Sequence, residues 1–239
     1  MSYDFYDYTY TSVADLKEKA ADYIKYEAKH GNILNPVVLE GRNIATSWWG
    51  KAWCNNLERY ADYKSRLERG RRYVRANCVL DLNIDYANVV ALVQGSQKNP
   101  YRVQITIDPL PELRYQKIIY KCSSKIENIE SLINGKFPNE LKELFADKKA
   151  GLFPSMKEIH FKCTCPDWAD MCKHTAAVLY GIGNRFDTSP LLFFKLRGIN
   201  IEEMASDLVD NRLEQMLNNA DKASSRILDD SLVNKIFGI

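Results

Sequence analysis

The chain has 239 residues, of which 46% are hydrophobic and 27% are charged, and its formal net charge is +2 at pH 7. This length is enough to bury a substantial core, in one large domain or in two small ones. The sequence shows no signal peptide, no apolar run long enough to cross a bilayer, and few cysteines for its length. These features argue against a secreted disulfide-linked domain and against a membrane partner, and they predict a cytoplasmic protein.

The small net charge conceals an asymmetry along the chain. Residues 1–40 carry four basic and seven acidic side chains, and residues 199–239 carry four basic and eight acidic ones. The middle of the chain, residues 41–198, therefore carries 25 basic and 16 acidic side chains, a balance of +9. We expect a polyanionic partner for this middle part, and a solvated surface of mixed charge is the alternative.

The first ten residues hold five aromatic rings among aspartates. They predict an arm or edge strand that packs on the main body, with disorder as the alternative. Ser12 can then cap a helix that runs to about His30 and has Leu16 on its inner face. An extended link follows through residues 37–39.

A second helix is predicted to begin at Thr46 or Ser47, because either side chain can cap it. One face of this helix carries Trp49, Trp53, Leu57 and Tyr60, at spacings of four, four and three. This spacing favours packing in the core. Trp48 lies off the centre of that face, so stacking on a ligand is the alternative for this ring.

Residues 64–75 carry six basic side chains against one acidic side chain, and Gly70 in the middle argues against a regular helix. We predict a basic turn with Tyr73 embedded in it, which can follow a phosphate backbone and offer a ring for stacking. The predicted nucleic-acid contacts of this turn are Arg69, Arg71, Arg72 and Arg75. A loop that is merely solvated is the alternative.

Three stretches then show strand patterns. Apolar and polar residues alternate from Val74 to Ile84, residues 89–93 are continuously apolar, and residues 101–107 alternate again. Short connections predict a three-stranded antiparallel meander, whose apolar face the tryptophan-bearing helix is expected to cover. The predicted fold class is α+β, with this meander covered by helices and followed by a helical segment and a ββα-like zinc module.

Pro109 and Pro111 mark a boundary after the third strand. We predict an N-terminal α+β domain over residues 1–110, and an acidic C-terminal helical segment over residues 199–239. Between them, residues 111–198 contain short helices near Ser124 and from Pro138, then a zinc finger at about residues 157–186. The C-terminal segment includes a docking helix over residues 201–218, judged from its helical apolar spacing.

The finger is predicted from Cys163, Cys165, Cys172 and His174, which lie within 12 residues. In a reducing compartment, thiolates next to an imidazole indicate a tetrahedral zinc site of the Cys3His type. All four positions are filled, whereas a catalytic zinc keeps one position open, so we expect a structural zinc and no zinc chemistry. Ordinary buried thiols are the alternative, and this is how we interpret Cys54, Cys78 and Cys122.

The surroundings of the four ligands also have a pattern. Cys163 and Cys165 lie at the end of a predicted strand. Cys172 and His174 lie at the start of a predicted helix that begins at Lys173. Trp168 lies between the ligand pairs, where it can cover the metal core or stack on a base, and we favour the cover. The predicted nucleic-acid contacts near the finger are Lys173, Lys195 and Arg197, because the metal with three thiolates carries no positive charge.

The pattern C-x-C-x6-C-x-H resembles the SWIM zinc finger. Residues 44–54 and 67–75 resemble the upstream region of the bacterial and archaeal proteins built around that finger, so the resemblance covers roughly residues 41–198. It implies the same four zinc ligands. It also implies binding to DNA or to protein, often in company with ATP-driven helicases of the chromatin-remodelling type, and it implies no catalytic reaction.

The sequence therefore predicts a nucleic-acid-binding accessory protein, with DNA favoured over RNA and a helicase as a possible partner. A protein adaptor whose finger docks a helicase is one alternative, and an enzyme with an unrecognised site is another. We predict no enzyme, because the chain shows neither a phosphate-binding glycine loop nor a Ser-His-Asp ordering. Loss of zinc is expected to unfold residues 157–186 alone and to spare the meander, whose core uses other residues.

Overall fold

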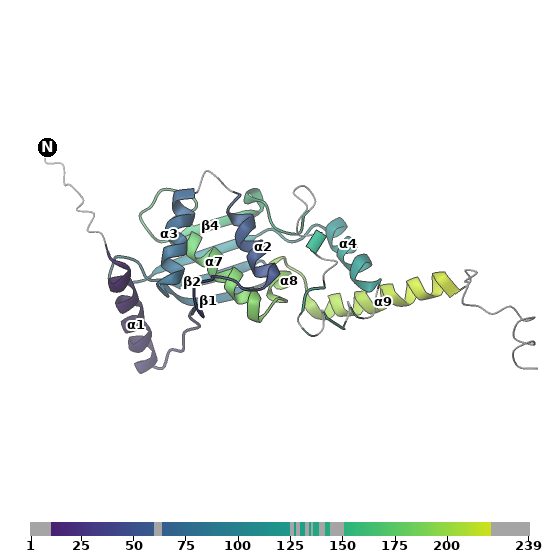
Figure 1. The fold of residues 1–239 in the computed structure, drawn as a ribbon, viewed down its shortest axis with the longest axis horizontal. Coiled ribbons are helices and arrows are strands. Elements are labelled where there is room, and N and C mark those ends of the chain that lie inside the picture. The colour runs from purple at the N-terminus through teal and green to yellow at the C-terminus, as the bar shows by residue number, and fades with distance from the viewer. Residues whose placement is uncertain are drawn as a thin grey trace, which may run out of the picture.

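The computed structural model describes residues 11–59, 64–124 and 151–220, together with residues 127, 130, 131, 134, 136–138, 142 and 143 (Figure 1). The described helices are α1 (Val13–Lys29), α2 (Trp48–Leu57), α3 (Lys64–Arg75), α4 (Glu112–Ser123), α7 (Lys173–Thr188), α8 (Leu192–Leu196) and α9 (Ile201–Ala220). The strands are β1 (Val79–Asp85), β2 (Asn88–Val93), β3 (Tyr101–Ile107) and β4 (Ile159–Cys163). The predicted aromatic arm at residues 1–10 and most of the two helices predicted between 124 and 150 lie outside the described residues.

The four strands form one antiparallel sheet in the order β1-β2-β3-β4. Ile105 of β3 lies opposite Val89 of β2 on one side and Phe161 of β4 on the other, so all three side chains share a face. The α+β class is confirmed, but the number of strands was wrong. The strand predicted to belong to a separate zinc module joins the meander as its fourth strand, so the sheet crosses the boundary predicted at residue 110.

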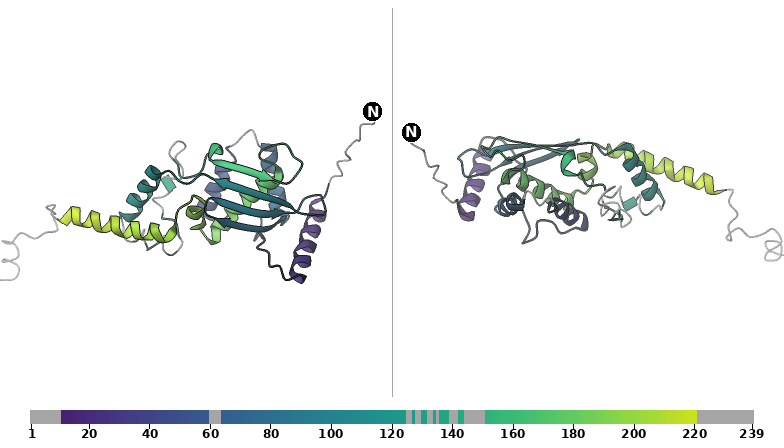
Figure 2. Two further views of the ribbon diagram at one scale, coloured as in Figure 1. Left: turned by 180° about the vertical axis from the view of Figure 1, so that it is seen from behind. Right: turned by 90° about the horizontal axis from the view of Figure 1, so that it is seen from above.

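Helices α2, α3, α7 and α8 lie on one face of this sheet, and the other face is open (Figure 2). Helix α7 contacts all four strands and forms the direct cover. Helix α2, which was expected to cover the sheet, packs on α7 instead. Its Trp53 Nε1 donates to the carbonyl of Leu179 at 2.8 Å, and Trp49 Nε1 donates to that of Phe186 at 2.7 Å. The tryptophans are therefore core residues of a helix pair.

Residues 64–75 form a helix, and the prediction of a basic turn was wrong. The buried face of α3 consists of Leu67, Gly70, Tyr73 and Val74. A Cβ built on Gly70 would lie 2.6 Å from the Cβ of Ala176 in α7, closer than real contacts allow. Gly70 thus permits a close helix crossing, and it does not mark a turn. The first strand accordingly begins at Val79 and not at Val74.

The N-terminal elements follow the sequence prediction closely. The side chain of Ser12 caps α1 by accepting from the backbone N–H of Asp15 at 3.1 Å, and Asp15 completes the capping box. The predicted extended link runs beside β1, where the Val37 N–H donates to the carbonyl of Val79 at 3.0 Å. Leu16 and Val37 thereby enter the common core.

Helix α4 was not predicted, and its C-cap is Ser124, the residue at which the next helix was predicted to begin. The described residues of that predicted helix, 127, 130 and 131, are helical. Helix α4 packs against α9, which extends away from the sheet (Figure 1). Ser123 Oγ donates to Asn211 Oδ1 at 2.6 Å across this pair. The predicted C-terminal helix is confirmed as an element, and its exposed apolar residues are Val209, Leu213, Met216 and Leu217. Its docking role stays a prediction. No helix among the described residues is both long enough and apolar enough to span a membrane.

Candidate metal centre

The four predicted ligands come from the junction of β4 and α7. Cys163 is the last residue of β4, and Cys165 follows in the turn. Cys172 is the N-cap of α7, where its Sγ accepts from the backbone N–H of Thr175 at 3.4 Å, and His174 is the second residue of the helix. The helix N-terminus favours negative charge, so this position suits a thiolate.

The ligand atoms of the four side chains all lie within 4.8 Å of one another. Nδ1 of His174 is 3.9 Å from Sγ of Cys163 and 3.8 Å from Sγ of Cys172. A tetrahedral zinc with bonds of about 2.0–2.3 Å separates its ligand atoms by roughly 3.5–3.8 Å. The group is therefore compatible with a metal such as zinc, and Nδ1 is the histidine nitrogen that faces it.

The electrostatics of the group agree with metal binding. Burial lowers the pKa of His174, which keeps the imidazole neutral and able to coordinate. A hydrogen bond from Cys163 lowers the pKa of Cys172, and the same bond raises the pKa of Cys163, since the two sulfurs compete for one proton. A bound dication would remove this competition by stabilising both thiolates.

Aromatic rings hold the His174 side chain in place. Its ring centroid lies 4.4 Å from that of Tyr101 and 5.4 Å from that of Tyr73. A Cβ built on Gly95 would lie 2.4 Å from the Tyr101 ring and 3.0 Å from Nε2 of His174. The absence of a side chain at Gly95 therefore lets the two rings pack, and Nδ1 is turned toward the sulfurs.

Helix α3 packs directly against this centre. Nη1 and Nη2 of Arg66 donate to the two carboxylate oxygens of Asp167 at 2.7 and 3.1 Å, in the loop between the ligand pairs. Asp167 also caps that loop by accepting from the backbone N–H of Ala169 at 3.3 Å. Sequence reasoning missed the role of Arg66, because its partner lies 101 residues away.

Trp168 does not cover the metal core. Its side chain is 91% exposed, so the cover that we favoured is wrong and the ring is available to a partner. The loop is held at its base by the ion pair of Asp167 and by the ligands. Trp168 is thus a large exposed ring on an anchored loop.

The predicted contacts on α3 differ in their surroundings. Arg69 and Arg75 are exposed, whereas Arg71 and Arg72 are half-buried. Arg71 forms an ion pair with Glu58 at 2.9 Å, and its guanidinium lies 6.0 Å from the centre of the Tyr180 ring. Tyr73 is buried, so it cannot stack on a base as predicted.

The contacts predicted near the finger are dispersed. Lys173 lies over the ring of Tyr73 at 5.9 Å, and Lys195 pairs with Asp85 at 3.0 Å. Arg197 is fully buried, and its Nη2 donates to Glu158 Oε1 at 2.9 Å. A phosphate cannot reach this guanidinium, so the prediction for Arg197 is corrected: the residue has a structural role.

All six cysteines are free thiols. Cys54, Cys78 and Cys122 lie outside the ligand group, in agreement with the sequence prediction. Burial raises the pKa of Cys54 and of Cys78 to about 12, so both remain protonated thiols at neutral pH.

The fold and the site define a mixed α+β protein with a Cys3His group compatible with a metal. The chain is 33% identical over 181 residues to the uncharacterized protein Rv2102 of Mycobacterium tuberculosis, and the aligned part covers 75% of this chain. The aligned part spans 65% of the length of that relative. No family model and no solved structure matches the chain. The resemblance to the SWIM finger therefore stays a prediction.

Proposed function

We propose that the chain is a cytoplasmic, non-enzymatic accessory protein that binds nucleic acid, in which a SWIM-type zinc centre positions the basic helix α3. The observation that carries this proposal is the packing of α3 on the centre. The Arg66–Asp167 ion pair ties the helix to the finger loop, Tyr73 packs on the ligand His174, and Gly70 lies against Ala176 of α7. A metal held by that centre fixes the orientation of α3.

The exposed side of α3 supplies the charge. Lys64 and Arg69 are exposed, and neither forms an ion pair within the described part of the chain. Zinc with three thiolates and a neutral imidazole has a net charge of −1, so these side chains must provide the attraction for a polyanion. DNA is the favoured ligand, and an ATP-driven helicase is the partner that the SWIM resemblance implies.

A salt titration of nucleic-acid binding tests this proposal. Replacing Lys64 and Arg69 by glutamine removes two positive charges from the exposed side of α3. If these groups contact phosphates, log Kd against log salt should lose about 0.7–0.9 units of slope for each contact, with similar losses for all base sequences. Binding is measured by fluorescence anisotropy on single- and double-stranded DNA and RNA.

A matched control removes the same charge elsewhere. Arg102 and Lys162 are exposed on strands β3 and β4. Arg102 alternates with the buried Val103, and Lys162 lies opposite Gln104, so both belong to the face of the sheet that α7 does not cover. The Arg102→Gln, Lys162→Gln variant should keep the salt slope of the unaltered protein. If the salt slope of binding falls in the control variant and is unchanged in the α3 variant, the open sheet face binds the nucleic acid. If the unaltered protein shows no salt-dependent binding, the proposed function is wrong.

The exposure of Trp168 favours a second candidate function, a protein adaptor that docks a helicase through its finger loop. The two functions predict different results for Trp168→Ala. Stacking on a base contributes about 1–3 kcal/mol, so loss of the ring should weaken nucleic-acid binding about 5- to 150-fold at an unchanged salt slope. Trp168→Phe, which keeps a ring, should retain most of the affinity. Equal affinity in all three proteins would favour the adaptor.

A further inference from the structure

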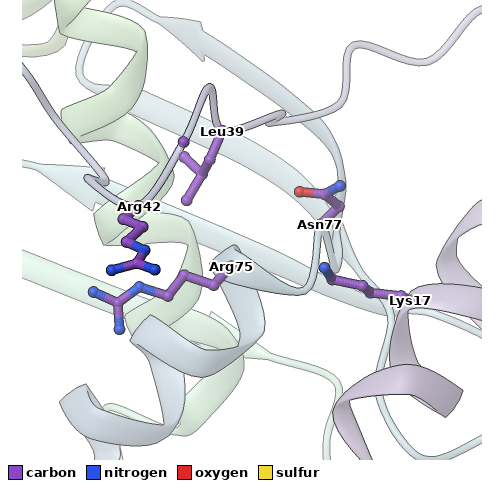
Figure 3. Close-up of a pocket in the computed structure, with 6 residues that line it drawn as sticks. Lys17, Leu39, Arg42, Arg75 and Asn77 are labelled. Carbon is purple, nitrogen blue, oxygen red and sulfur yellow. The ribbon is translucent and has the colours of Figure 1, made fainter.

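A second group of basic side chains meets at the C-terminal end of α3. A surface hollow of about 400 Å³ is lined by Lys17, Leu39, Gly41, Arg42, Arg75 and Asn77. These residues come from α1, from the link before α2, from the end of α3 and from the turn before β1. Figure 3 shows the guanidinium groups of Arg42 and Arg75 facing each other, with Leu39 beside them. Residues distant in sequence thus place three cations around one space.

These three cations form no ion pair within the part of the chain that the structure describes, and none of the described residues that line the hollow is a carboxylate. Two guanidinium groups held face to face repel each other unless an anion lies between them. Their fork-shaped donors match the oxygens of a phosphate group. The arrangement is that of an anion site.

The end of α3 does not oppose an anion. A helix C-terminus normally presents unpaired carbonyl oxygens, which repel negative charge. Here the carbonyl of Arg72 accepts from the N–H of Ala76, that of Tyr73 accepts from Cys78, and that of Val74 accepts from Asn77. Asn77 adopts a positive φ of 56°, which turns the chain out of the helix and completes this cap.

We propose that Arg42 and Arg75 together hold one phosphate group of a bound nucleic-acid backbone. Lys17, which lies beside Asn77 on the other side of Arg75 (Figure 3), adds positive charge to the same hollow. This inference rests on the proposed function, and it extends the contact surface from α3 to α1 and to the link before α2. Arg75 is the residue that both surfaces share. Leu39 adds an apolar wall on which the neighbouring sugar can pack.

A double-mutant cycle tests the shared phosphate. Arg42→Gln and Arg75→Gln should each lower the salt slope of binding to a single-stranded oligonucleotide by about 0.7 units. Because both side chains hold the same phosphate, the double variant should lose little more than either single variant. Independent contacts would instead give about twice the loss. Lys17→Gln, which removes a charge apart from the shared phosphate, should change the slope independently of both.

Two controls separate a binding role from a structural one. The melting temperature of the free protein should not fall in the Arg42→Gln variant, because the change relieves repulsion between like charges. Arg102→Gln, on the open face of the sheet, should leave the slope unchanged. A lower melting temperature with unchanged binding would mean that Arg42 is structural, and the proposal would be wrong.

Inorganic pyrophosphate distinguishes a free phosphate ligand from a nucleic-acid backbone. If pyrophosphate raises the melting temperature of the unaltered protein but not of Arg42→Gln, while oligonucleotide binding is equal in both, the site holds a free phosphate compound and this inference is overturned. If Arg42→Gln and Arg75→Gln bind oligonucleotides normally while the Lys64 and Arg69 variant binds weakly, the inference fails and the proposed function stands. If the unaltered protein does not bind nucleic acid, both this inference and the proposed function are wrong.

Discussion

Replacement of His174 by alanine is expected to release the metal and to unfold the sheet together with the finger. A structural zinc contributes an apparent free energy of about 10–16 kcal/mol in small fingers, whereas a whole domain is stable by only about 5–15 kcal/mol. The contribution of the metal is thus as large as the total stability. Cys172→Ser, which removes another ligand, should have the same effect.

The reason for this joint unfolding is the shared core. Strand β4 ends at the ligand Cys163 and pairs with β3, and α7 begins beside two ligands and covers all four strands. Disorder in residues 157–186 would therefore expose the inner face of the sheet, including Val103 and Ile105. The expectation from sequence, that the meander survives alone, does not fit this arrangement.

The measurement combines elemental analysis of anaerobically prepared protein with thermal unfolding followed by circular dichroism. We expect one zinc per chain in the unaltered protein and none in His174→Ala. Cys54→Ser serves as the control, since this thiol lies outside the ligand group and should leave the zinc content unchanged. A metal-free protein with a normal cooperative transition would contradict the prediction.

Replacement of Glu158 by glutamine is expected to lower the free energy of unfolding by about 3 kcal/mol. The change leaves the guanidinium of Arg197 buried without its counter-ion, and breaking a buried ion pair from one side costs about 3–5 kcal/mol. We expect the lower end of this range, because the Glu158 side chain is still 20% exposed. Glutamine retains an acceptor for the N–H of Ser155, which Glu158 bonds at 2.8 Å.

The ion pair between Glu158 and Arg197 also makes the free energy of unfolding depend on pH. Burial raises the pKa of Glu158, but hydrogen bonds from Ser155 and Arg197 outweigh burial and place the pKa below the ordinary value of 4.5. A carboxyl whose pKa is lower in the folded state stabilises the fold above its ordinary pKa. That stability is lost as the pH falls through the lowered value. The glutamine variant should lack this part of the acid sensitivity.

Urea unfolding at neutral pH and at several acidic pH values measures both effects. In the double variant Glu158→Gln, Arg197→Met, no charge remains buried, so most of the lost stability should return. Equal urea midpoints for Glu158→Gln and the unaltered protein at neutral pH would show that the pair contributes little.

The metal group could be predicted because its determinants are local. The four ligands lie within 12 residues, after a strand and at the start of a helix. This spacing leaves few possible arrangements of the four side chains around a metal. The caps at Ser12 and Ser47 were predictable for the same reason, since each acts on a backbone N–H only three residues away.

The remaining features depend on contacts between distant residues. Gly70 is a helix breaker by propensity, yet its missing side chain is what allows α3 to cross α7 at Ala176. Arg197 follows an apolar run and looks like a surface cation, but Glu158 holds it inside the protein. The hollow between Arg42 and Arg75 has no local signature, because only the fold brings these residues together.

The position of α7 in the sequence has a consequence for synthesis on the ribosome. Strand β3 ends at residue 107 and α7 begins at residue 173, so 65 residues separate the completed meander from its cover. At about 5–20 residues per second, translation of that interval takes roughly 3–13 s. During this time the nascent chain carries an apolar sheet face that only its own later residues can bury. A molecular chaperone would protect that face from aggregation, whereas the metal cannot bind fully until its last ligand, His174, has been synthesised.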